Sequence, residues 1–351
     1  MSELVQAEQL VAPLSRMLYE PSIKVDGLQR LSGGANMQTW ALDARTANNT
    51  YPLILRRKPS GVGRAQTAPP LRTEVIVKSP QLVTLSALSL ATEAALISLA
   101  AEMGVKVPRV WGVLEDQDNL GEGMVLERLK GEALPPKILR ASELADARDR
   151  FAFEAGRELA KLHQAPIDRC PIQLRNMSWE EDLQRLQSLS DHFRNPSPVH
   201  QLAINWLREQ SAPQTPRVLC HGDFRLGNVL MDSSGIVSIL DWELAHVGYA
   251  GEDLGYLSAN VWRFGGAKPV AGIGEYESLL QSYMDHGGSE ITMDELHLWQ
   301  LYAALGWGFS CLTMLELHLS GEDPGLERAA VGRRLSESEV DILLLLDARL
   351  S

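Results

Sequence analysis

The sequence of 351 residues is poor in cysteine and has no excess of positive charge. Its three cysteines, Cys170, Cys220 and Cys311, are widely spaced and form no C-x-x-C pair, which argues against a zinc or dithiol site. Unpaired cysteines of this kind are typical of proteins in a reducing compartment. The net charge of −12 leaves the chain without the overall basic surface that nucleic acids require. We therefore predict a cytoplasmic protein that does not bind nucleic acid.

Sequence signals for secretion or membrane insertion are also scarce. Segment 1–20 has no basic region followed by an apolar core, so no signal peptide is expected. One run, Leu298–Leu315, lacks charged residues over 18 positions, but it contains Gln300 and is flanked by Glu295 and Glu316 instead of Lys or Arg. The length is borderline for a membrane span and the flanking charges are wrong for one. We predict a buried core helix there and no membrane association.

Several common catalytic motifs are missing from the sequence. It contains no G-x-S-x-G elbow, no Walker loop and no His/Asp cluster with transition-metal spacing. What it does contain is a strand-rich first part and a helix-rich second part. The predicted strands are 25–31, 37–42, 51–55, 107–114, 123–129, 218–220, 229–231 and 236–240, and the predicted helices are 3–18, 82–103, 142–164, 178–193 and 199–210, with mostly helical structure after 252.

This order of elements predicts an α+β protein with two lobes. The expected N-lobe, 1–125, is a small antiparallel β-sheet with one large helix that ends before Gly104. A hinge over 126–131 connects it to a larger, mostly helical C-lobe over 132–351. The segment Pro59–Pro80 is rich in Pro, Gly and Arg and is interpreted as an inserted loop.

The residues from Cys220 to Asn228, C-H-G-D-F-R-L-G-N, and the later L-D-W-E carry the groups that phosphoryl transfer needs. Asp223 can accept the proton of an attacking hydroxyl group. Asn228 and Asp241 offer oxygen ligands to Mg²⁺, a hard cation that prefers oxygen, and the hairpin between them would bring both to one edge. The alternative is a buried turn in which Asp223 only caps a helix. His221 is interpreted as a scaffold residue of the loop.

These two motifs resemble the catalytic and metal-binding loops of the aminoglycoside phosphotransferase family, which includes choline-kinase-like enzymes. The resemblance is greatest to a bacterial branch related to the kinase-like domain of acyl-CoA dehydrogenase-associated proteins. It covers nearly the whole chain and implies a protein-kinase-like fold, ATP and Mg²⁺ as cofactors, Asp223 as catalytic base, and Asn228 and Asp241 as metal ligands. Weaker matching pieces are Leu31–Ala35, Val107–Val110, Trp262–Gly265 and Gly332–Arg334.

The same resemblance implies a nucleotide site between the lobes. Ser32, Gly33 and Gly34 lie between two predicted strands, where glycine lets backbone N–H groups approach phosphates; by itself the Gly pair indicates only a hairpin turn. The backbone of Glu127 and Leu129 in the hinge would bind the adenine edge.

A kinase of this type also needs a cation on the third strand, paired with a helical Glu. Arg56 takes that position, whereas Arg57 and Lys58 are expected to face solvent. Glu93, thirty-seven positions later, is the expected partner of Arg56, and Glu74 is the alternative.

Further residues have supporting roles in this interpretation. Arg225 would either neutralise charge on the transferred phosphate or form a structural salt bridge. Asp253 matches an acidic position that braces the catalytic loop. The helical region after 255 would build the acceptor pocket, with Trp262, Arg263 and Trp307 as lining residues.

The sequence thus predicts an ATP-dependent phosphotransferase acting on a hydroxyl group of a small molecule. The branch resemblance suggests a hydroxyacyl-CoA or related hydroxy compound as acceptor. An aminoglycoside kinase and a non-catalytic nucleotide-binding module are the alternatives. A protein kinase is disfavoured, because the eleven residues between Asp241 and Asp253 leave no room for a long activation segment.

Overall fold

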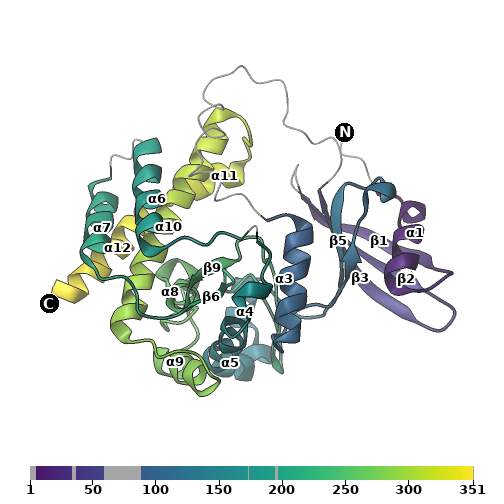
Figure 1. Ribbon diagram of the computed structural model, residues 1–351, viewed down its shortest axis with the longest axis horizontal. Helices are drawn as coiled ribbons and strands as arrows, with labels where there is room; N and C mark the ends of the chain where they lie inside the picture. Colours follow the sequence, from purple (N-terminus) through teal and green to yellow (C-terminus); the bar gives the residue numbers. More distant parts are fainter. Residues whose placement is uncertain (1–4, 34–36, 59–87, 173, 194–196, 351) are drawn as a thin grey trace.

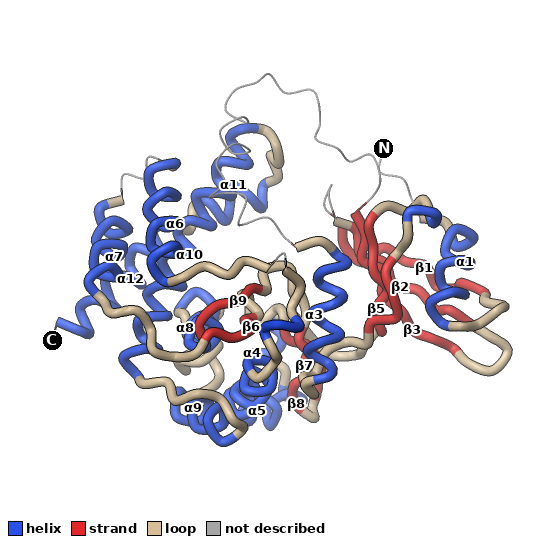
Figure 2. Tube along the Cα trace, viewed as in Figure 1, coloured by secondary structure: helices blue, strands red, loops and turns tan. Residues whose placement is uncertain are grey.

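The computed structural model describes residues 5–33, 37–58, 88–172, 174–193 and 197–350, and these form two lobes (Figure 1). One lobe holds a five-stranded antiparallel sheet and the other is mostly helical. Figure 2 shows this separation, with most red strands gathered in the small lobe and most blue helices in the large one. The predicted α+β bilobal fold is confirmed.

The small lobe is a sheet with a helix on each face. Its strand order is β1-β2-β3-β5-β4. Helix α1 packs against β1 and β4, and α3 packs against β4 and β5 from the C-lobe side. The elements are α1 (Ala7–Leu18), β1 (Lys24–Gly33), β2 (Gln38–Arg45), β3 (Thr50–Lys58), α3 (Leu90–Glu102), β4 (Val110–Val113) and β5 (Glu122–Glu127).

Helix α3 starts and stops at residues that suit its ends. Ser89 caps it, because its hydroxyl oxygen accepts the N–H of Thr92 at 3.1 Å. Gly104 follows the last turn with a φ of +76°, which glycine adopts without strain. The helix was expected over 82–103, and positions 82–87 lie outside the described residues, as does the predicted loop 59–80.

Strand β3 places its two arginines on opposite faces of the sheet, since successive side chains alternate. Arg56 points toward the C-lobe. Arg57 was expected in solvent but is only 2% exposed. The alternation of side chains along β3 places Arg57 on the buried face of the sheet. There its guanidinium donates to Gln38 Oε1 at 3.1 Å and to the Leu120 carbonyl at 3.1 Å, which satisfies the buried cation.

The large lobe surrounds two short, two-stranded antiparallel ladders with helices. Strand β6 pairs with β9, and β7 pairs with β8. Strand β9 was not predicted, because four residues next to a helix give too short a pattern. The elements are α4 (Pro135–Arg140), α5 (Ala145–His163), α6 (Trp179–His192), α7 (Pro198–Glu209), β6 (Arg217–Cys220), β7 (Val229–Asp232), β8 (Gly235–Ile239), β9 (His246–Tyr249), α8 (Ala250–Ser258), α9 (Tyr276–Asp285), α10 (Met293–Ser320), α11 (Leu326–Gly332) and α12 (Leu335–Leu350).

The uncharged run 298–315 forms the middle of α10, a helix of 28 residues. Helices α7, α8, α11 and α12 pack around it, and Trp299, Leu305 and Phe309 are buried in these contacts. The prediction of a core helix is therefore correct. Among the described residues, no helix has the length and apolar character needed to cross a bilayer.

The connection between the lobes leaves the sheet at the end of β5. Glu127 is the last strand residue, and its N–H donates to the Arg109 carbonyl at 2.8 Å. Leu129 lies in the extended stretch that follows, before an isolated bridge joins Glu132 to Met231 of the C-lobe.

Candidate active site

The catalytic-loop segment predicted from the sequence connects β6 to β7 in the large lobe. It begins where β6 ends at Cys220 and closes with a turn in which the Asn228 N–H donates to the Arg225 carbonyl at 3.1 Å. Gly222 has a φ of +80°, and a Cβ there would lie 2.4 Å from the Leu244 carbonyl oxygen. Only glycine fits this position, because both the dihedral and the space exclude a side chain.

The carboxylate of Asp223 accepts hydrogen bonds on both oxygens. Its Oδ1 accepts from Arg225 Nε at 2.9 Å and from the Tyr256 hydroxyl at 2.8 Å. Its Oδ2 accepts from Asn228 Nδ2 at 2.5 Å. These donors favour the charged carboxylate, and Oδ2 retains lone-pair capacity for one more donor.

His221 and Asp253 hold the backbone that carries Asp223. The ring of His221 accepts from the Asp223 N–H at 3.2 Å through Nδ1 and donates through Nε2 to the Leu240 carbonyl at 3.0 Å. Burial lowers the pKa of His221, in keeping with this neutral tautomer. The contacts of His221 are therefore those of a scaffold residue, as the sequence predicted.

Asp253 braces the loop from beneath, as the sequence predicted. Its two oxygens accept the N–H groups of His221 at 2.7 Å and Gly222 at 2.9 Å, and Oδ2 also contacts His163 Nε2 at 3.1 Å. Burial alone would raise the pKa of Asp253, but the hydrogen bonds from His163 and from the backbone lower it overall. The result is a fixed negative charge behind the loop.

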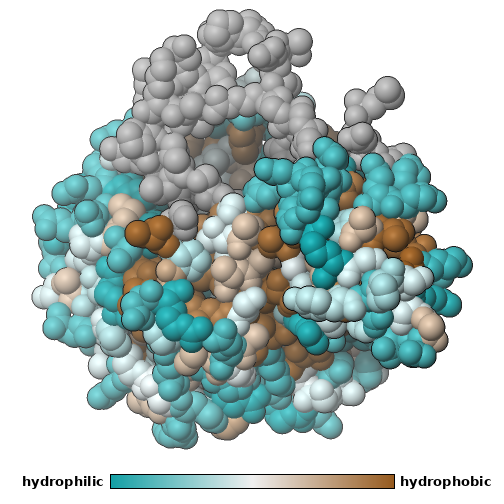
Figure 3. Space-filling view, turned by 45° about the vertical axis from the view of Figure 1, so that its right-hand side comes forward, coloured by the Kyte–Doolittle hydropathy of each residue, from teal (hydrophilic) through white to brown (hydrophobic). Residues whose placement is uncertain are grey.

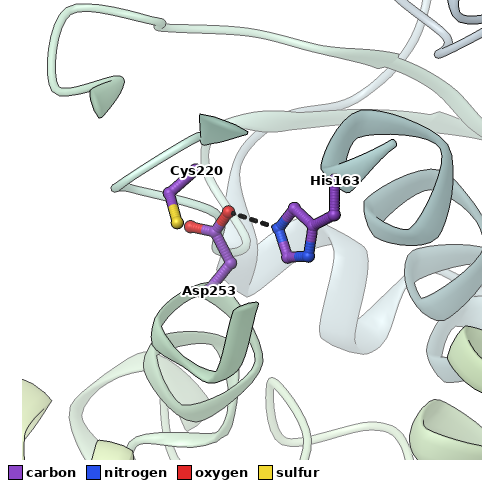
Figure 4. Close-up of side chains that lie close together, drawn as sticks. All are labelled: His163, Cys220 and Asp253. Carbon is purple, nitrogen blue, oxygen red and sulfur yellow. Dashed lines mark hydrogen bonds and ion pairs between the residues drawn. The ribbon is translucent and has the colours of Figure 1, made fainter. Parts of the chain in front are cut away.

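Figure 4 shows how closely His163 and Asp253 meet Cys220. The three ligand-type atoms lie within 4.8 Å of one another, as a metal site would require. Their bonding is already accounted for, since Asp253 binds the loop and His163 Nδ1 contacts the Tyr283 hydroxyl at 2.8 Å. Burial raises the pKa of the Cys220 thiol well above its usual range, which disfavours the thiolate that metals bind. The cluster is a structural brace.

The two predicted magnesium ligands are connected through the backbone. The N–H of Leu240, just before Asp241, donates to the Asn228 carbonyl at 2.7 Å. Because the amide nitrogen of Asn228 donates to Asp223, its Oδ1 is the atom left as a ligand. Asp241 has a φ of 64°, which is unusual for a residue other than glycine and is typical of functional sites. Its side chain is 37% exposed.

An oxygen pair of this kind suits Mg²⁺, which takes few protein ligands and keeps waters and phosphate oxygens. Asn228 contributes a neutral amide oxygen and Asp241 an anionic one. Asn228 contacts the Asp223 carboxylate directly, and its carbonyl accepts the N–H of Leu240, the residue before Asp241, so these residues form one edge of the candidate site.

Arg56 connects the small lobe to this edge. Its Nη1 lies 2.8 Å from Glu93 Oε2 in α3, and its Nη2 lies 3.3 Å from Asp241 Oδ1. Glu93 is fully buried, and its Oε1 has no hydrogen-bond partner among the described residues. Burial, opposed by Arg56, raises the pKa of Glu93 to about 7. Glu74, the alternative partner, lies outside the described residues.

The predicted phosphate loop is described in part. Ser32 and Gly33 end β1, where they pair with Thr39 and Gln38 of β2, and Gly34 lies outside the described residues. In the hinge, the Glu127 N–H donates to the Arg109 carbonyl, so this N–H is already used within the protein and the predicted adenine contact of Glu127 would have to use its carbonyl.

Arg225 lies between the Asp223 carboxylate and an aromatic cluster. Beside its bond to Asp223, its guanidinium stacks 4.6 Å from the centre of the Trp262 ring. The sequence left open whether Arg225 neutralises the transferred phosphate or forms a structural salt bridge, and these contacts correspond to the salt bridge. Trp262 also packs against Trp307 and Tyr256. Sequence reasoning missed Tyr256, because nothing in the local pattern marks a residue 33 positions from its partner.

A cavity of about 640 Å³ adjoins the catalytic loop, between α3, α6, α10 and the segment after Asp241. Trp262, Arg263 and Trp307 were expected to line the acceptor pocket, but they are not among the residues that line this cavity. Their side chains support Arg225 and α8 instead. In Figure 3, brown hydrophobic residues gather in the middle of one face of the molecule, below the atoms drawn in grey.

Known proteins resemble this chain in fold over its full length. A candidate aminoglycoside phosphotransferase from Ralstonia eutropha JMP134 has a TM-score of 0.72 at 17% identity, covering 98% of each chain. Macrolide 2′-phosphotransferase from Brachybacterium faecium has a TM-score of 0.59 at 17% identity, covering 93% of this chain and 98% of that one. A spectinomycin phosphotransferase, solved with ADP and spectinomycin, has a TM-score of 0.59 at 14% identity, covering 98% and 99%.

Sequence comparison gives one curated relative and one family. Acyl-CoA dehydrogenase family member 10 of Mus musculus is 24% identical over an alignment of 237 positions, which covers 63% of this chain and 20% of that protein. This chain therefore matches only about a fifth of the relative's length. The model of the phosphotransferase enzyme family matches residues 27–285, which include the segment from Cys220 to Asn228, the hinge and parts of both lobes. The chain belongs to this phosphotransferase enzyme family.

Proposed function

We propose that this protein transfers the γ-phosphoryl group of ATP to a hydroxyl group of a small molecule. The observation that supports it is that Asn228 bonds to the Asp223 carboxylate and accepts, through its carbonyl, the N–H of Leu240 just before Asp241. Family membership makes a phosphotransferase the expected class, and the specific reaction is inferred from this geometry.

In the proposed reaction the acceptor oxygen bonds to the γ-phosphorus while the bond from that phosphorus to the β–γ bridging oxygen breaks, and ADP leaves. The hydroxyl proton passes to Asp223 Oδ2, the oxygen with spare lone-pair capacity. Arg225 and Tyr256 hold Oδ1 and so fix the direction of the carboxylate. This is general base catalysis by a positioned side chain.

Asn228 Oδ1 and the Asp241 carboxylate would hold Mg²⁺. When bound, the ion neutralises charge on the β- and γ-phosphates. Arg56, held by Glu93, contributes a permanent positive charge at the same edge, and a guanidinium can bind two phosphate oxygens at once. Ser32, Gly33 and Gly34 would cover the phosphates, and the backbone of Glu127 and Leu129 would bind the adenine.

For the acceptor we propose a hydroxyacyl-CoA or a related hydroxy compound. The support is the H-G-D-F-R-x-G-N and L-D-W-E pattern together with the match to an acyl-CoA dehydrogenase family member. An aminoglycoside-type acceptor is the second candidate, because solved structures of this fold include aminoglycoside kinases. The reaction is expected in the cytoplasm.

A screen of hydroxyl compounds for Mg²⁺-dependent ADP release, with mass spectrometry of the product, tests the proposal. We expect one compound class to gain a phosphate. Thermal stabilisation by ATP and Mg²⁺ without turnover on any compound would instead identify a nucleotide-binding module.

The metal assignment has its own test. Asp241→Ala should weaken binding of the Mg²⁺–ATP complex, measured by calorimetry, while the exposed Asp149→Ala leaves it unchanged. Equal affinity in the two variants would contradict the ligand role of Asp241.

A further inference from the structure

The cavity beside the catalytic loop touches the catalytic centre at two residues. Gly222 precedes Asp223, and Tyr256 donates to the Asp223 carboxylate at 2.8 Å; both line the cavity. Its volume of about 640 Å³ lies within the usual range for small-molecule sites. The cavity thus adjoins Asp223 through these two residues, although Asp223 itself is not among the residues that line it.

One helical glycine at the cavity has no structural explanation. Glycine in a helix interior costs about 0.5–1 kcal/mol relative to alanine. Gly308 of α10 is explained by packing, because a Cβ there would lie 2.5 Å from both His200 and Ser338. Gly306, one half-turn earlier, would meet nothing within 4 Å. Since Gly306 lines the cavity, the missing side chain leaves room in it.

The wall around Gly306 is apolar. Leu186 and Leu189 of α6 and Ala303 and Phe309 of α10 line the cavity, and all four are buried. An aliphatic or aromatic body would gain contact with these side chains, at about 25 cal/mol for each Å² of apolar surface removed from water.

Two cavity carboxylates are already neutralised by the protein. Glu252 contacts His246 Nε2 at 2.8 Å and accepts the Tyr249 N–H at 2.7 Å. Asp253 is fully buried under the catalytic loop, with the bonds described above. A polycation therefore finds few negative charges here that are free to pair with it, although Glu243 also lines the cavity.

The cavity also offers hydrogen-bond donors. Arg185 of α6 donates to the Tyr302 hydroxyl at 2.8 Å, and both residues line the cavity. No acceptor for the hydroxyl hydrogen of Tyr302 is found in the part of the chain that the structure describes. Arg185 and Arg175 both form ion pairs with Asp182, and Arg175 also lies 4.0 Å from Glu252 Oε2. These groups suit a carbonyl or carboxylate oxygen.

We propose that this cavity is the acceptor site and that it selects a hydroxy compound with a mainly apolar body, with a carbonyl or carboxylate oxygen bound by Tyr302 and Arg185. Gly306 sets the space for the apolar body. The inference rests on the proposed kinase function and narrows its acceptor class.

The test uses Gly306→Leu in the full chain. The Cβ meets open space and leucine favours a helix, so folding should be retained, whereas the rest of the side chain fills the cavity. Thr313→Leu, in the same helix but outside the cavity lining, is the matched control. The probes are medium-chain hydroxy acids, their CoA thioesters, gentamicin and spectinomycin.

We expect the wild type to prefer the apolar hydroxy compounds. Gly306→Leu should lower kcat/KM for them by about 10- to 100-fold and shift the preference to shorter chains, with ATP binding unchanged. Thr313→Leu should resemble the wild type. Preference for an aminoglycoside, or full activity of Gly306→Leu, would overturn this inference and leave the kinase proposal intact. Absence of phosphorylation of any hydroxyl compound would overturn the kinase proposal itself.

Discussion

Gly222 of the catalytic loop and Gly306 of α10 line the same cavity for opposite physical reasons. At Gly222 a side chain is excluded by a positive φ and by the Leu244 carbonyl 2.4 Å from an ideal Cβ. At Gly306 a side chain has open space. The first glycine is required by the backbone geometry of the loop that carries Asp223, and the second leaves open volume in the cavity.

The surroundings of the two glycines differ in the same way. Around Gly222 the loop is fixed by hydrogen bonds from its backbone to Asp253, and around Gly306 the contacts are apolar. Hydrogen bonds demand exact partners, whereas apolar contacts need only shape and volume. If the cavity binds the acceptor, as we propose, substitutions in α6 and α10 should change the preferred acceptor without altering the loop that carries Asp223.

The largest effect is expected where the loop meets the substrate. Asp223→Asn should lower kcat by about 10²–10⁴-fold, because the amide cannot take the hydroxyl proton, and it should leave ATP affinity unchanged. Steady-state kinetics and calorimetry measure the two quantities. Asp149→Asn, an exposed carboxylate of α5, serves as control. Retained turnover in Asp223→Asn would remove Asp223 from its role.

The loop around Gly222 is held in place by Asp253. Asp253→Asn turns one acceptor toward the backbone N–H groups into a donor and should lower stability by about 2–4 kcal/mol at neutral pH, as judged by urea unfolding. Unfolding midpoints equal to the wild type would show that the loop does not need this brace.

Comparing the wild type with Asp253→Asn at different pH values gives a second prediction. The pKa of Asp253 is lower in the folded protein, so its contribution is present above the unfolded pKa of about 3.9 and is lost as the pH falls through the folded pKa. The stability difference between wild type and Asp253→Asn should therefore shrink below about pH 4. A difference that stays constant down to the folded pKa would contradict the assigned charge.

Tyr256 connects the two regions, because it lines the cavity and donates to Asp223. Tyr256→Phe removes one hydrogen bond to the base, and we expect kcat to fall about three- to tenfold with little change in KM for ATP. Tyr283→Phe, which loses its contact with His163, is a control for removal of a buried hydroxyl. A fall in melting temperature without a change in kcat would make Tyr256 purely structural.

The smallest effect concerns Gly306 itself. Gly306→Ala should raise the free energy of unfolding by about 0.5–1 kcal/mol, since alanine favours the helix and its Cβ meets no neighbour. Gly308→Ala, in the same helix, should instead destabilise the protein, because its Cβ would collide with His200 and Ser338. If thermal unfolding showed stability changes of the same sign in Gly306→Ala and Gly308→Ala, the contrast between the two glycines would be wrong.

Much of the fold followed from local sequence patterns. Hydrophobic periodicity predicted five strands of the small lobe, the helix that ends before Gly104 and the buried helix over 298–315. The strand β9 was missed, because four residues that pair with distant β6 carry no pattern of their own. The expected exposure of Arg57 was wrong. Its guanidinium is buried and donates to Gln38 and to the Leu120 carbonyl, and these partners are brought to it only by the packing of the lobe.

The sequence by itself determined the chemical groups of the catalytic loop, because Asp223, Asn228 and their scaffold His221 lie within nine residues whose turn geometry is local. The tertiary structure alone decided what surrounds them. Arg56 meets Asp241 across 185 positions, and the cavity takes its walls from α6 and α10. Such contacts depend on how whole elements pack, and no spacing along the chain encodes that packing.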